Sequence, residues 1–95
     1  MLPVARLGDR TFGYCLVHGP QSGTICTGST DTMTNNMPTA RLGDLIIADC
    51  GDTATIITSS TVTMANNLGV ARLGDLGAGT YECTIVTGST DTFSG

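Results

Sequence analysis

One seven-residue phrase occurs three times and constrains what this chain can fold into. Each copy ends in Ala-Arg-Leu-Gly-Asp, and the copies occupy residues 3–9, 38–44 and 69–75. A second phrase, rich in Thr, Ser and Asn, recurs between them at residues 27–38, 58–69 and 87–95. Equivalent positions lie 29 to 35 residues apart, a period typical of architectures in which no single unit can bury its apolar face alone. We therefore predict one domain over residues 1–95, made of three repeats at roughly 3–37, 38–68 and 69–95.

Composition narrows the class of protein. A chain of 95 residues can bury only a modest core, but a 40% hydrophobic fraction is too high for a disordered chain. The net charge of −4, with four Arg and no Lys, offers no basic surface for a phosphate backbone, so nucleic-acid binding is not expected. No apolar run approaches the roughly 20 residues needed to cross a bilayer, and no export signal is recognisable, so we expect a soluble chain with reduced cysteines.

The repeats carry strand signals and almost no helix signal. Short β-branched segments at 24–27, 55–58 and 84–87 are expected to be strands, each running through a small-residue turn into a second short strand at 30–33, 61–64 and 90–93. Two asparagine pairs, Asn35-Asn36 and Asn66-Asn67, suit the left-handed backbone of a tight turn. The sequence therefore predicts an all-β domain of short hairpin-like modules.

The Arg-Leu-Gly-Asp segments are expected to close each module. Their glycines are predicted to adopt positive φ and their leucines to point inward. Each arginine can fork onto the aspartate three residues later, which would lock the turn, and we favour this interpretation over an anion-binding ring of the three arginines. The arginines concerned are Arg6, Arg41 and Arg72.

Three modules in one chain can close around a pseudo-threefold axis, which leaves few exposed strand edges. The third copy stops within its second strand, before any Asn-Asn turn. We therefore expect Met1-Leu2-Pro3 to complete the third module across the chain ends.

The cysteines divide by their place in the repeat. Cys26 aligns with Ile57 and Val86 and is read as a small apolar residue. The other three cysteines and the only histidine fall in the loops that follow the three Asp residues, and closure would gather these loops at one end. We therefore predict a tetrahedral structural zinc site, with iron, or Cys83 left unliganded, as alternatives. Its ligands are Cys15, His18, Cys50 and Cys83.

No enzyme is expected. With the only histidine assigned to the metal, no Ser-His-Asp set remains, and four protein ligands leave no open position for a catalytic water. Asp49, Asp52 and Glu82 are interpreted as solvated loop charges.

Three copies of Pro-x-Ala-Arg-x-Gly-Asp, the third with Gly69 in place of proline, together with Ile-x-x-Gly-Ser or a variant and the Asn-Asn turns, resemble the PAAR-repeat proteins. The resemblance covers essentially the whole chain. It implies a compact conical β domain with a metal near its apex and a flat base that caps the trimeric β-helical spike of a contractile injection machine. Family metal sites look His-rich, so Cys15 and Cys83 would stand in for histidines here.

The function implied is that of a structural tip, one copy per spike trimer, which helps to pierce the target envelope and contacts the membrane transiently. The compact chain resembles phage baseplate tips of the T4 type more than extended secretion effectors. We therefore expect it at the tip of a virion tail, assembled in the host cytoplasm, with a type VI secretion spike tip, made in the bacterial cytoplasm and then secreted, as the alternative. Thr-x-Thr patterns at 30–34, 61–63 and 90–92 also raise an ice-binding β protein, but repeats of unequal length do not provide the flat, even coils it needs.

Overall fold

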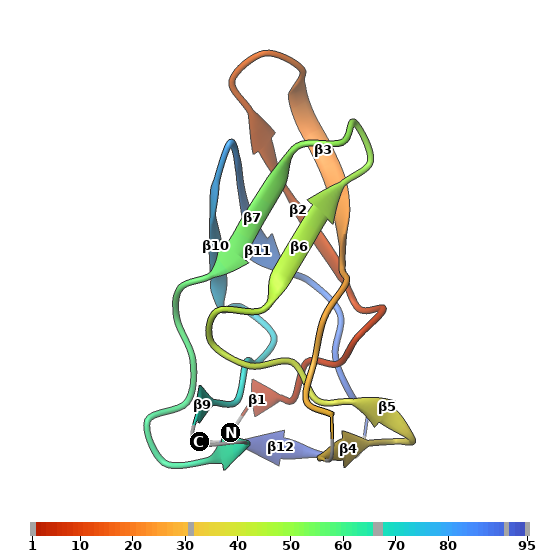
Figure 1. The fold of residues 1–95 in the computed structure, drawn as a ribbon, viewed down its shortest axis with the longest axis vertical. Coiled ribbons are helices and arrows are strands. Elements are labelled where there is room, and N and C mark those ends of the chain that lie inside the picture. Colours follow the sequence, from red (N-terminus) through yellow and green to blue (C-terminus); the bar gives the residue numbers. More distant parts are fainter. Residues whose placement is uncertain (1, 31, 66–67, 91, 95) are drawn as a thin grey trace.

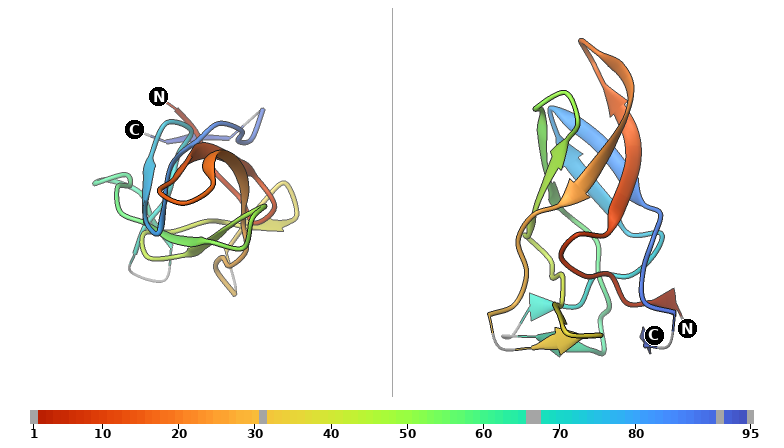
Figure 2. Two further views of the ribbon diagram at one scale, coloured as in Figure 1. Left: turned by 90° about the horizontal axis from the view of Figure 1, so that it is seen from above. Right: turned by 90° about the vertical axis from the view of Figure 1, so that its right-hand side faces the viewer.

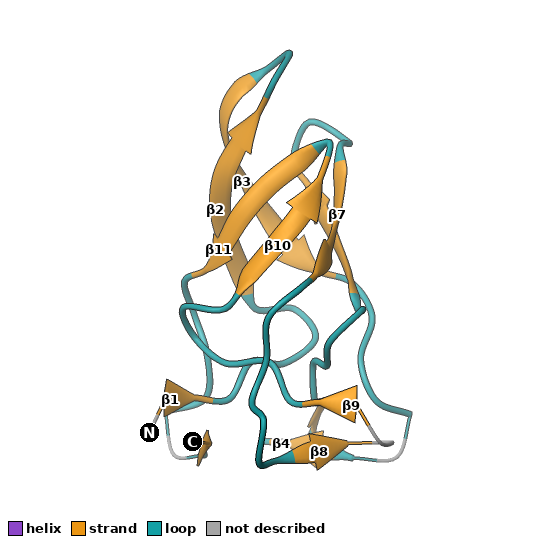
Figure 3. Cartoon of the chain, turned by 90° about the vertical axis from the view of Figure 1, so that its left-hand side faces the viewer, coloured by secondary structure: helices purple, strands orange, loops and turns teal. Residues whose placement is uncertain are grey.

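The computed structural model describes residues 2–30, 32–65, 68–90 and 92–94, and strands are the only regular elements among them (Figure 3). None of the described residues forms a helix of the length and hydrophobicity needed to span a membrane. The strands are β1 (Leu2–Pro3), β2 (Arg10–Cys15), β3 (Gly19–Ile25), β4 (Met33–Thr34), β5 (Met37–Pro38), β6 (Leu45–Ala48), β7 (Thr53–Ile56), β8 (Met64–Ala65), β9 (Leu68–Gly69), β10 (Leu76–Gly79), β11 (Tyr81–Ile85) and β12 (Phe93–Ser94).

Six of these strands form a closed antiparallel barrel in the order β10-β11-β2-β3-β6-β7. The barrel consists of three hairpins, β2–β3, β6–β7 and β10–β11, which surround a central axis when the molecule is seen from above (Figure 2). They point toward one end of the molecule, and β2–β3 reaches farthest (Figure 1). Closure pairs β11 with β2, so the barrel has no unpaired edge strand, as the sequence predicted.

The predicted long strands lie close to β3, β7 and β11, but each observed strand ends two residues earlier than predicted and also begins earlier. Their hairpin partners β2, β6 and β10 were predicted to be loops, which is wrong: all three are strands of four to six residues, two of which contain glycine. The predicted second strands are also displaced. The ribbons begin at Met33, Met64 and Phe93, and the described residues directly before them belong to no strand.

Three two-stranded ribbons form the opposite end, here called the base (Figure 1). They are β4–β5, β8–β9 and β12–β1. In the third, Leu2 pairs with Ser94 and Pro3 with Phe93, which confirms that the N-terminal segment completes the third module. The first ribbon turns through Asn35 and Asn36, whose φ angles are 54° and 64° as predicted, whereas Asn66 and Asn67 lie outside the described residues.

A ring of three alanines joins the modules at the waist between base and barrel. The Ala5 N–H donates to the Ala71 carbonyl at 2.9 Å, Ala71 donates to Ala40 at 3.0 Å, and Ala40 donates to Ala5 at 3.0 Å. All three side chains are fully buried. Backbones this close around one axis leave room for little more than a methyl group, which accounts for the alanine of the repeated phrase.

The predicted Arg–Asp turn lock is present in every module. In the second, the Arg41 guanidinium donates from Nε to Asp44 Oδ2 at 3.1 Å and from Nη2 to Oδ1 at 3.0 Å. The Thr27 hydroxyl, from the preceding module, donates to the same carboxylate at 2.8 Å and accepts the Leu45 N–H at 2.9 Å. Each clamp therefore links two modules. The equivalent sets are Arg6, Asp9 and Thr87, and Arg72, Asp75 and Thr58.

Glycines complete these turns. Gly8, Gly43 and Gly74 have φ near 90°, as predicted. Their N–H groups donate to the last residue of β3, β7 and β11, respectively, at 2.9 Å. The leucines that precede them are only half-buried, so the expectation that they point fully inward is not met.

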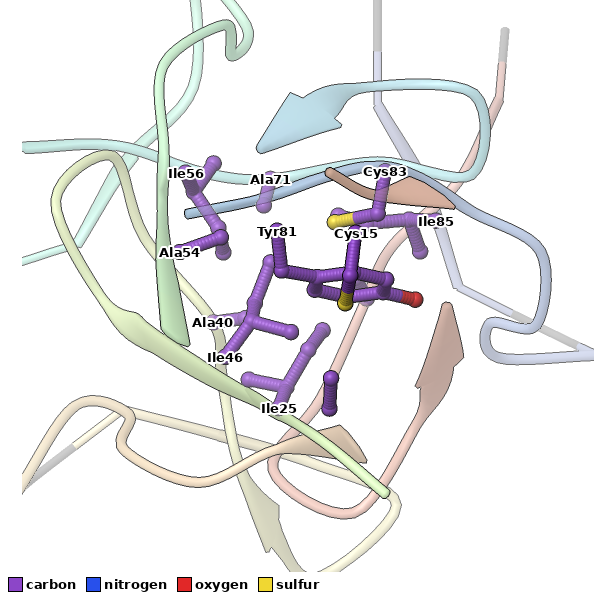
Figure 4. Close-up of a cluster of buried hydrophobic side chains, with 12 residues drawn as sticks. Cys15, Ile25, Ala40, Ile46, Ala54, Ile56, Ala71, Tyr81, Cys83 and Ile85 are labelled. Atoms are coloured by element: carbon purple, nitrogen blue, oxygen red, sulfur yellow. The ribbon is translucent and has the colours of Figure 1, made fainter. Parts of the chain in front are cut away.

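The barrel interior is filled by aliphatic side chains and one aromatic ring (Figure 4). Tyr81 is fully buried, and its hydroxyl lies 3.0 Å from Thr11 Oγ1 and donates to the Gln21 carbonyl at 3.2 Å. Gly23 makes room for the ring, because a Cβ there would lie 2.8 Å from it. The isoleucines packed around it are Ile25, Ile46, Ile56 and Ile85.

Cys26 does not join this core. It aligns with Ile57 and Val86 as predicted, but all three side chains are exposed on the outside of the molecule. The interpretation of Cys26 as a buried apolar residue is therefore wrong, because this register position follows the last inward residue of each strand and points outward.

Candidate metal centre

Two neighbouring turns at the apex of the barrel bring together four groups with metal-binding chemistry. Cys15 ends β2 and His18 lies in the turn that leads to β3, while Cys50 and Asp52 lie in the turn between β6 and β7. The turns are held side by side because β3 pairs with β6, and the Asp49 N–H extends that pairing by donating to the Ser22 carbonyl at 2.8 Å.

The four donor atoms converge. All lie within 4.8 Å of one another. Cys15 Sγ is 3.3 Å from Cys50 Sγ, His18 Nδ1 is 3.3 Å from Asp52 Oδ2, and Cys50 Sγ is 3.6 Å from the same oxygen.

These distances fit one tetrahedral ion. With metal–ligand bonds of about 2.0 to 2.3 Å, the edges of a tetrahedral zinc site measure roughly 3.3 to 3.8 Å. The three separations given above, 3.3 to 3.6 Å, are close to these edges. The donors as a set extend to 4.8 Å, so side chains would have to move inward to complete a tetrahedron around one ion. Two thiolates, an imidazole and a carboxylate are all groups that bind zinc in proteins.

The structure brings together three of the four predicted ligands and places the fourth elsewhere. Cys83 lies on β11, paired with Gly13 of β2 and Gly77 of β10, and is 6% exposed among the core side chains. Burial raises the pKa of its thiol, which keeps the group neutral. Cys83 is therefore part of the hydrophobic core, not of the donor cluster.

Asp52 occupies the place in the cluster that was predicted for Cys83. It was interpreted as an ordinary loop charge because its turn carries a second carboxylate, Asp49, and nothing in the local sequence distinguishes the two. A register count does separate the cysteines. Cys15 and Cys50 are each the sixth residue after the Asp of their repeat, and the sixth residue after Asp75 is Tyr81.

Tyr81 thus replaces the third donor of the repeat with an aromatic core residue. It pairs directly with Cys15 across β11 and β2. Because the third hairpin is the shortest, with a single residue between its strands, it cannot send another donor to the apex. The fourth ligand position falls to the second hairpin instead.

Two groups of the cluster have shifted pKa values, the Cys15 thiol and the Asp52 carboxyl. Burial, with further contributions from Cys50 and Asp52, raises the pKa of the Cys15 thiol to about 12. Hydrogen bonds from Cys15 and then His18 lower the pKa of Asp52. Cysteine binds metal as thiolate, so metal binding here must displace protons, and the affinity is expected to fall as the pH falls.

The cluster is covered on one side and open on the other. Cys15 is fully buried, whereas the side chains of His18 and Asp52 are 47% and 28% exposed. An ion bound here would join the first hairpin to the second beyond the Asp49–Ser22 hydrogen bond that extends their pairing. The arrangement is that of a structural staple near the tip of a small β domain.

The fold and the cluster define a class of protein: a three-module β domain that is closed by backbone rings at its waist and has a metal-binding apex. The PAAR motif family model matches residues 18–79, more than half of the chain, and the chain belongs to this family as a PAAR-repeat protein. Among curated proteins, no relative matches it. Proteins of the PAAR family are structural spike tips of contractile injection systems rather than enzymes, and the match indicates that role here.

Proposed function

We propose that this chain caps the trimeric β-helical spike of a phage tail baseplate, one copy per trimer, and helps to pierce the target cell envelope. A type VI secretion spike is the alternative partner. In the phage case the protein would be assembled in the host cytoplasm and carried at the tail tip, and in the other it would leave the bacterial cytoplasm by secretion.

The observation that carries the proposal is the composition of the base. Each of its three ribbons exposes one apolar side chain on its first strand and one on its second, all between 38% and 54% exposed. The strand register puts the two residues of each ribbon on opposite faces, and the second-strand residue shares its face with a buried neighbour. The first-strand residues therefore repeat one outward apolar side chain per module, and such a repeated apolar set marks a surface that meets a partner. These residues are Met33, Met64 and Phe93 on the first strands, and Met37, Leu68 and Leu2 on the second.

The symmetry of the base suits a trimer. The waist is a cyclic ring of three backbone hydrogen bonds, so the three ribbons are arranged around one axis. A single chain with three equivalent faces can satisfy three identical subunits without itself forming an oligomer. This predicts a stoichiometry of one chain to three spike subunits.

The experiment is co-expression with trimeric β-helical spike proteins from phage tails and from type VI systems, followed by native mass spectrometry. We expect one chain per trimer, and the partner that co-assembles decides between the two machines. Replacing Met33, Met64 and Phe93 together by Asp should abolish assembly, whereas Val17→Asp at the opposite end should not. Equal loss with both variants would contradict docking through the base.

For the apex we propose zinc, bound by Cys15, His18, Cys50 and Asp52, with iron as the alternative. The mixed thiolate, imidazole and carboxylate donors support a tetrahedral ion without redox chemistry. Such an ion resists splaying of the hairpins when the tip is loaded along its axis. Elemental analysis of protein purified without chelators should find one metal per chain, and protein without metal would contradict the staple.

A further inference from the structure

The turn at the apex carries an exposed aliphatic pair. Leu16 and Val17 are 87% and 85% exposed, the highest values among the large apolar side chains that the structure describes. They form the tip of the β2–β3 hairpin, which projects beyond the other two hairpins (Figures 1 and 2). Their position is thus at the opposite end of the molecule from the base.

The donor cluster brackets this pair in sequence. Cys15 precedes Leu16 and His18 follows Val17, and the donor atoms of both flanking residues lie in the group that spans 4.8 Å. With both ends of the turn drawn to one point, the two residues between them face away from the protein. An ion bound by Cys15 and His18 would close this small loop and hold the aliphatic side chains outward.

We propose that Leu16 and Val17 form a metal-braced apolar wedge that inserts into the lipid of the target membrane. This deepens the proposed spike-tip function and rests on it. The occupant is a bilayer, because the two aliphatic side chains are exposed at a projecting turn opposite the base, where the proposed function brings the chain to the envelope. The hollow beside Leu16, lined also by Tyr14 and Glu82, has a volume of about 70 Å³, too small to hold a segment of a protein partner.

The charges near the apex specify the kind of lipid. Asp49, Asp52 and Glu82 lie in the apical halves of the second and third hairpins, and the chain has no lysine. Arg10, at the waist end of β2, is paired with Asp49 at 3.1 Å. Without a basic patch, attraction to anionic headgroups is absent, so the wedge fits a bilayer of neutral, zwitterionic lipid.

Two aliphatic side chains give shallow and reversible insertion. Stable anchoring of a soluble protein needs a far larger apolar surface or two separate membrane signals. The wedge is therefore suited to first contact with the acyl region, and the force that drives the spike would have to come from the machine behind it.

The test uses the natural absence of tryptophan. Leu16→Trp places a single reporter in the wedge, and Val62→Trp places a matched reporter at a 74% exposed position on the segment leading into base ribbon β8. Both zinc-loaded proteins are mixed with phosphatidylcholine vesicles, with and without brominated chains. We expect a blue shift and quenching of the Leu16→Trp emission and no change for Val62→Trp. An unshifted Leu16→Trp spectrum, or equal shifts at both sites, would overturn the wedge.

Two further measurements separate the parts of the proposal. In vesicle flotation, Leu16→Ser with Val17→Ser should lower partitioning of the zinc-loaded protein by at least about tenfold, given the apolar area removed. Removing the metal by chelation should weaken the Leu16→Trp signal, and a signal of undiminished size would overturn the bracing role of the metal.

The wedge and the spike-tip function can fail separately. The serine double variant should still assemble with a spike trimer at one copy per trimer. Normal assembly without vesicle insertion by the parent chain would overturn the wedge alone, while insertion without any trimer assembly would overturn the docking function on which the wedge rests.

Discussion

At the base, three ribbons carry equivalent residues at equivalent positions, whereas at the apex three hairpins differ in length and only two of them supply metal donors. The base is held by contacts that repeat around the axis, such as the alanine ring, and each contact requires the same residue in every module. A metal ion requires four donors at one point and has no need for three equal contributions. The three modules are therefore alike at the base and waist, where equivalent contacts repeat, and they differ at the apex, where donors from different hairpins meet at one point.

Removing the metal is expected to have the largest effect on stability and tests whether the apex depends on its donors as the base depends on its repeated contacts. A structural zinc ion can contribute on the order of 10 kcal/mol to folding, and about 1 kcal/mol shifts the Tm of a domain this size by roughly 4 to 8 °C. Cys50→Ser, or chelation of the parent chain, should therefore lower the Tm by at least about 20 °C in differential scanning calorimetry. A Tm unchanged by chelation would mean that the apex needs no staple.

Two neighbouring variants sharpen the ligand assignment. Asp52→Asn should weaken zinc binding at least about tenfold in a chelator competition assay, because even outer partners of a metal site carry effects of that size. Cys83→Ala should bind zinc normally and lose only packing energy. The opposite ranking would restore Cys83 as the fourth ligand.

The next largest loss of stability is expected when an Arg–Asp clamp at the waist is changed. Hydrogen bonds to charged groups contribute about 1.5 to 3 kcal/mol, so Asp44→Asn should lower the free energy of unfolding by about 2 kcal/mol in urea titrations. Asp9→Asn and Asp75→Asn should have nearly the same effect, since all three carboxylates accept the same Arg and Thr contacts. Clearly unequal losses among the three variants would show that the clamps have the same geometry but contribute differently to stability.

Acid should weaken the clamp formed by Asp9. Burial alone would raise the pKa of Asp9, but hydrogen bonds from Arg6 and Thr87 outweigh it and hold the pKa below its ordinary value. A carboxyl group with a lowered folded pKa stabilises the protein above its unfolded pKa of about 4, and this contribution is lost as the pH falls through the folded value. Metal-free protein should therefore keep a constant contribution from this group above about pH 5 and lose it below about pH 4, measured by urea titration at each pH.

The smallest effect is expected at Cys26. Its side chain is exposed, and its Sγ donates only to the Thr24 carbonyl, at 3.3 Å. Since Val86 occupies the same register position, Cys26→Val should change the free energy of unfolding by no more than about 0.5 kcal/mol. A larger loss of unfolding free energy would contradict the conclusion that the Cys26 side chain makes no important contact.

Much of the fold could be predicted because each repeat contains contacts between residues that are close together in the sequence. The glycine that adopts positive φ, the arginine and the aspartate of each clamp lie within four residues of one another, so their contact follows from spacing alone. The completion of the third ribbon by Leu2 and Pro3 also followed, since only a closed ring supplies its missing strand. Strands β2, β6 and β10 were missed because pairing with neighbouring strands of the barrel, and not a β-branched pattern like that of the predicted strands, makes them strands.

The metal site could be predicted only in part. Cys15 and His18 are neighbours in sequence and Cys50 shares their register, so repeat counting brings these three together. The same count separates Cys83 from the other two cysteines, but it gives no reason to choose Asp52 as the fourth donor. Whether a residue in a turn reaches the axis depends on hairpin length and on which face of the strand it occupies, and both are settled by pairing across the barrel.

The sequence by itself determined that the chain folds as three modules around one axis, because the residues that make the same short-range turn contacts occur in three copies. Only the tertiary structure decided that Asp52 joins the donors at the apex, that the Tyr81 side chain fills the barrel interior and that Cys83 lies in the core. The physical reason is that turn contacts depend on residues a few positions apart, whereas convergence on a point depends on the lengths and registers of all three hairpins together.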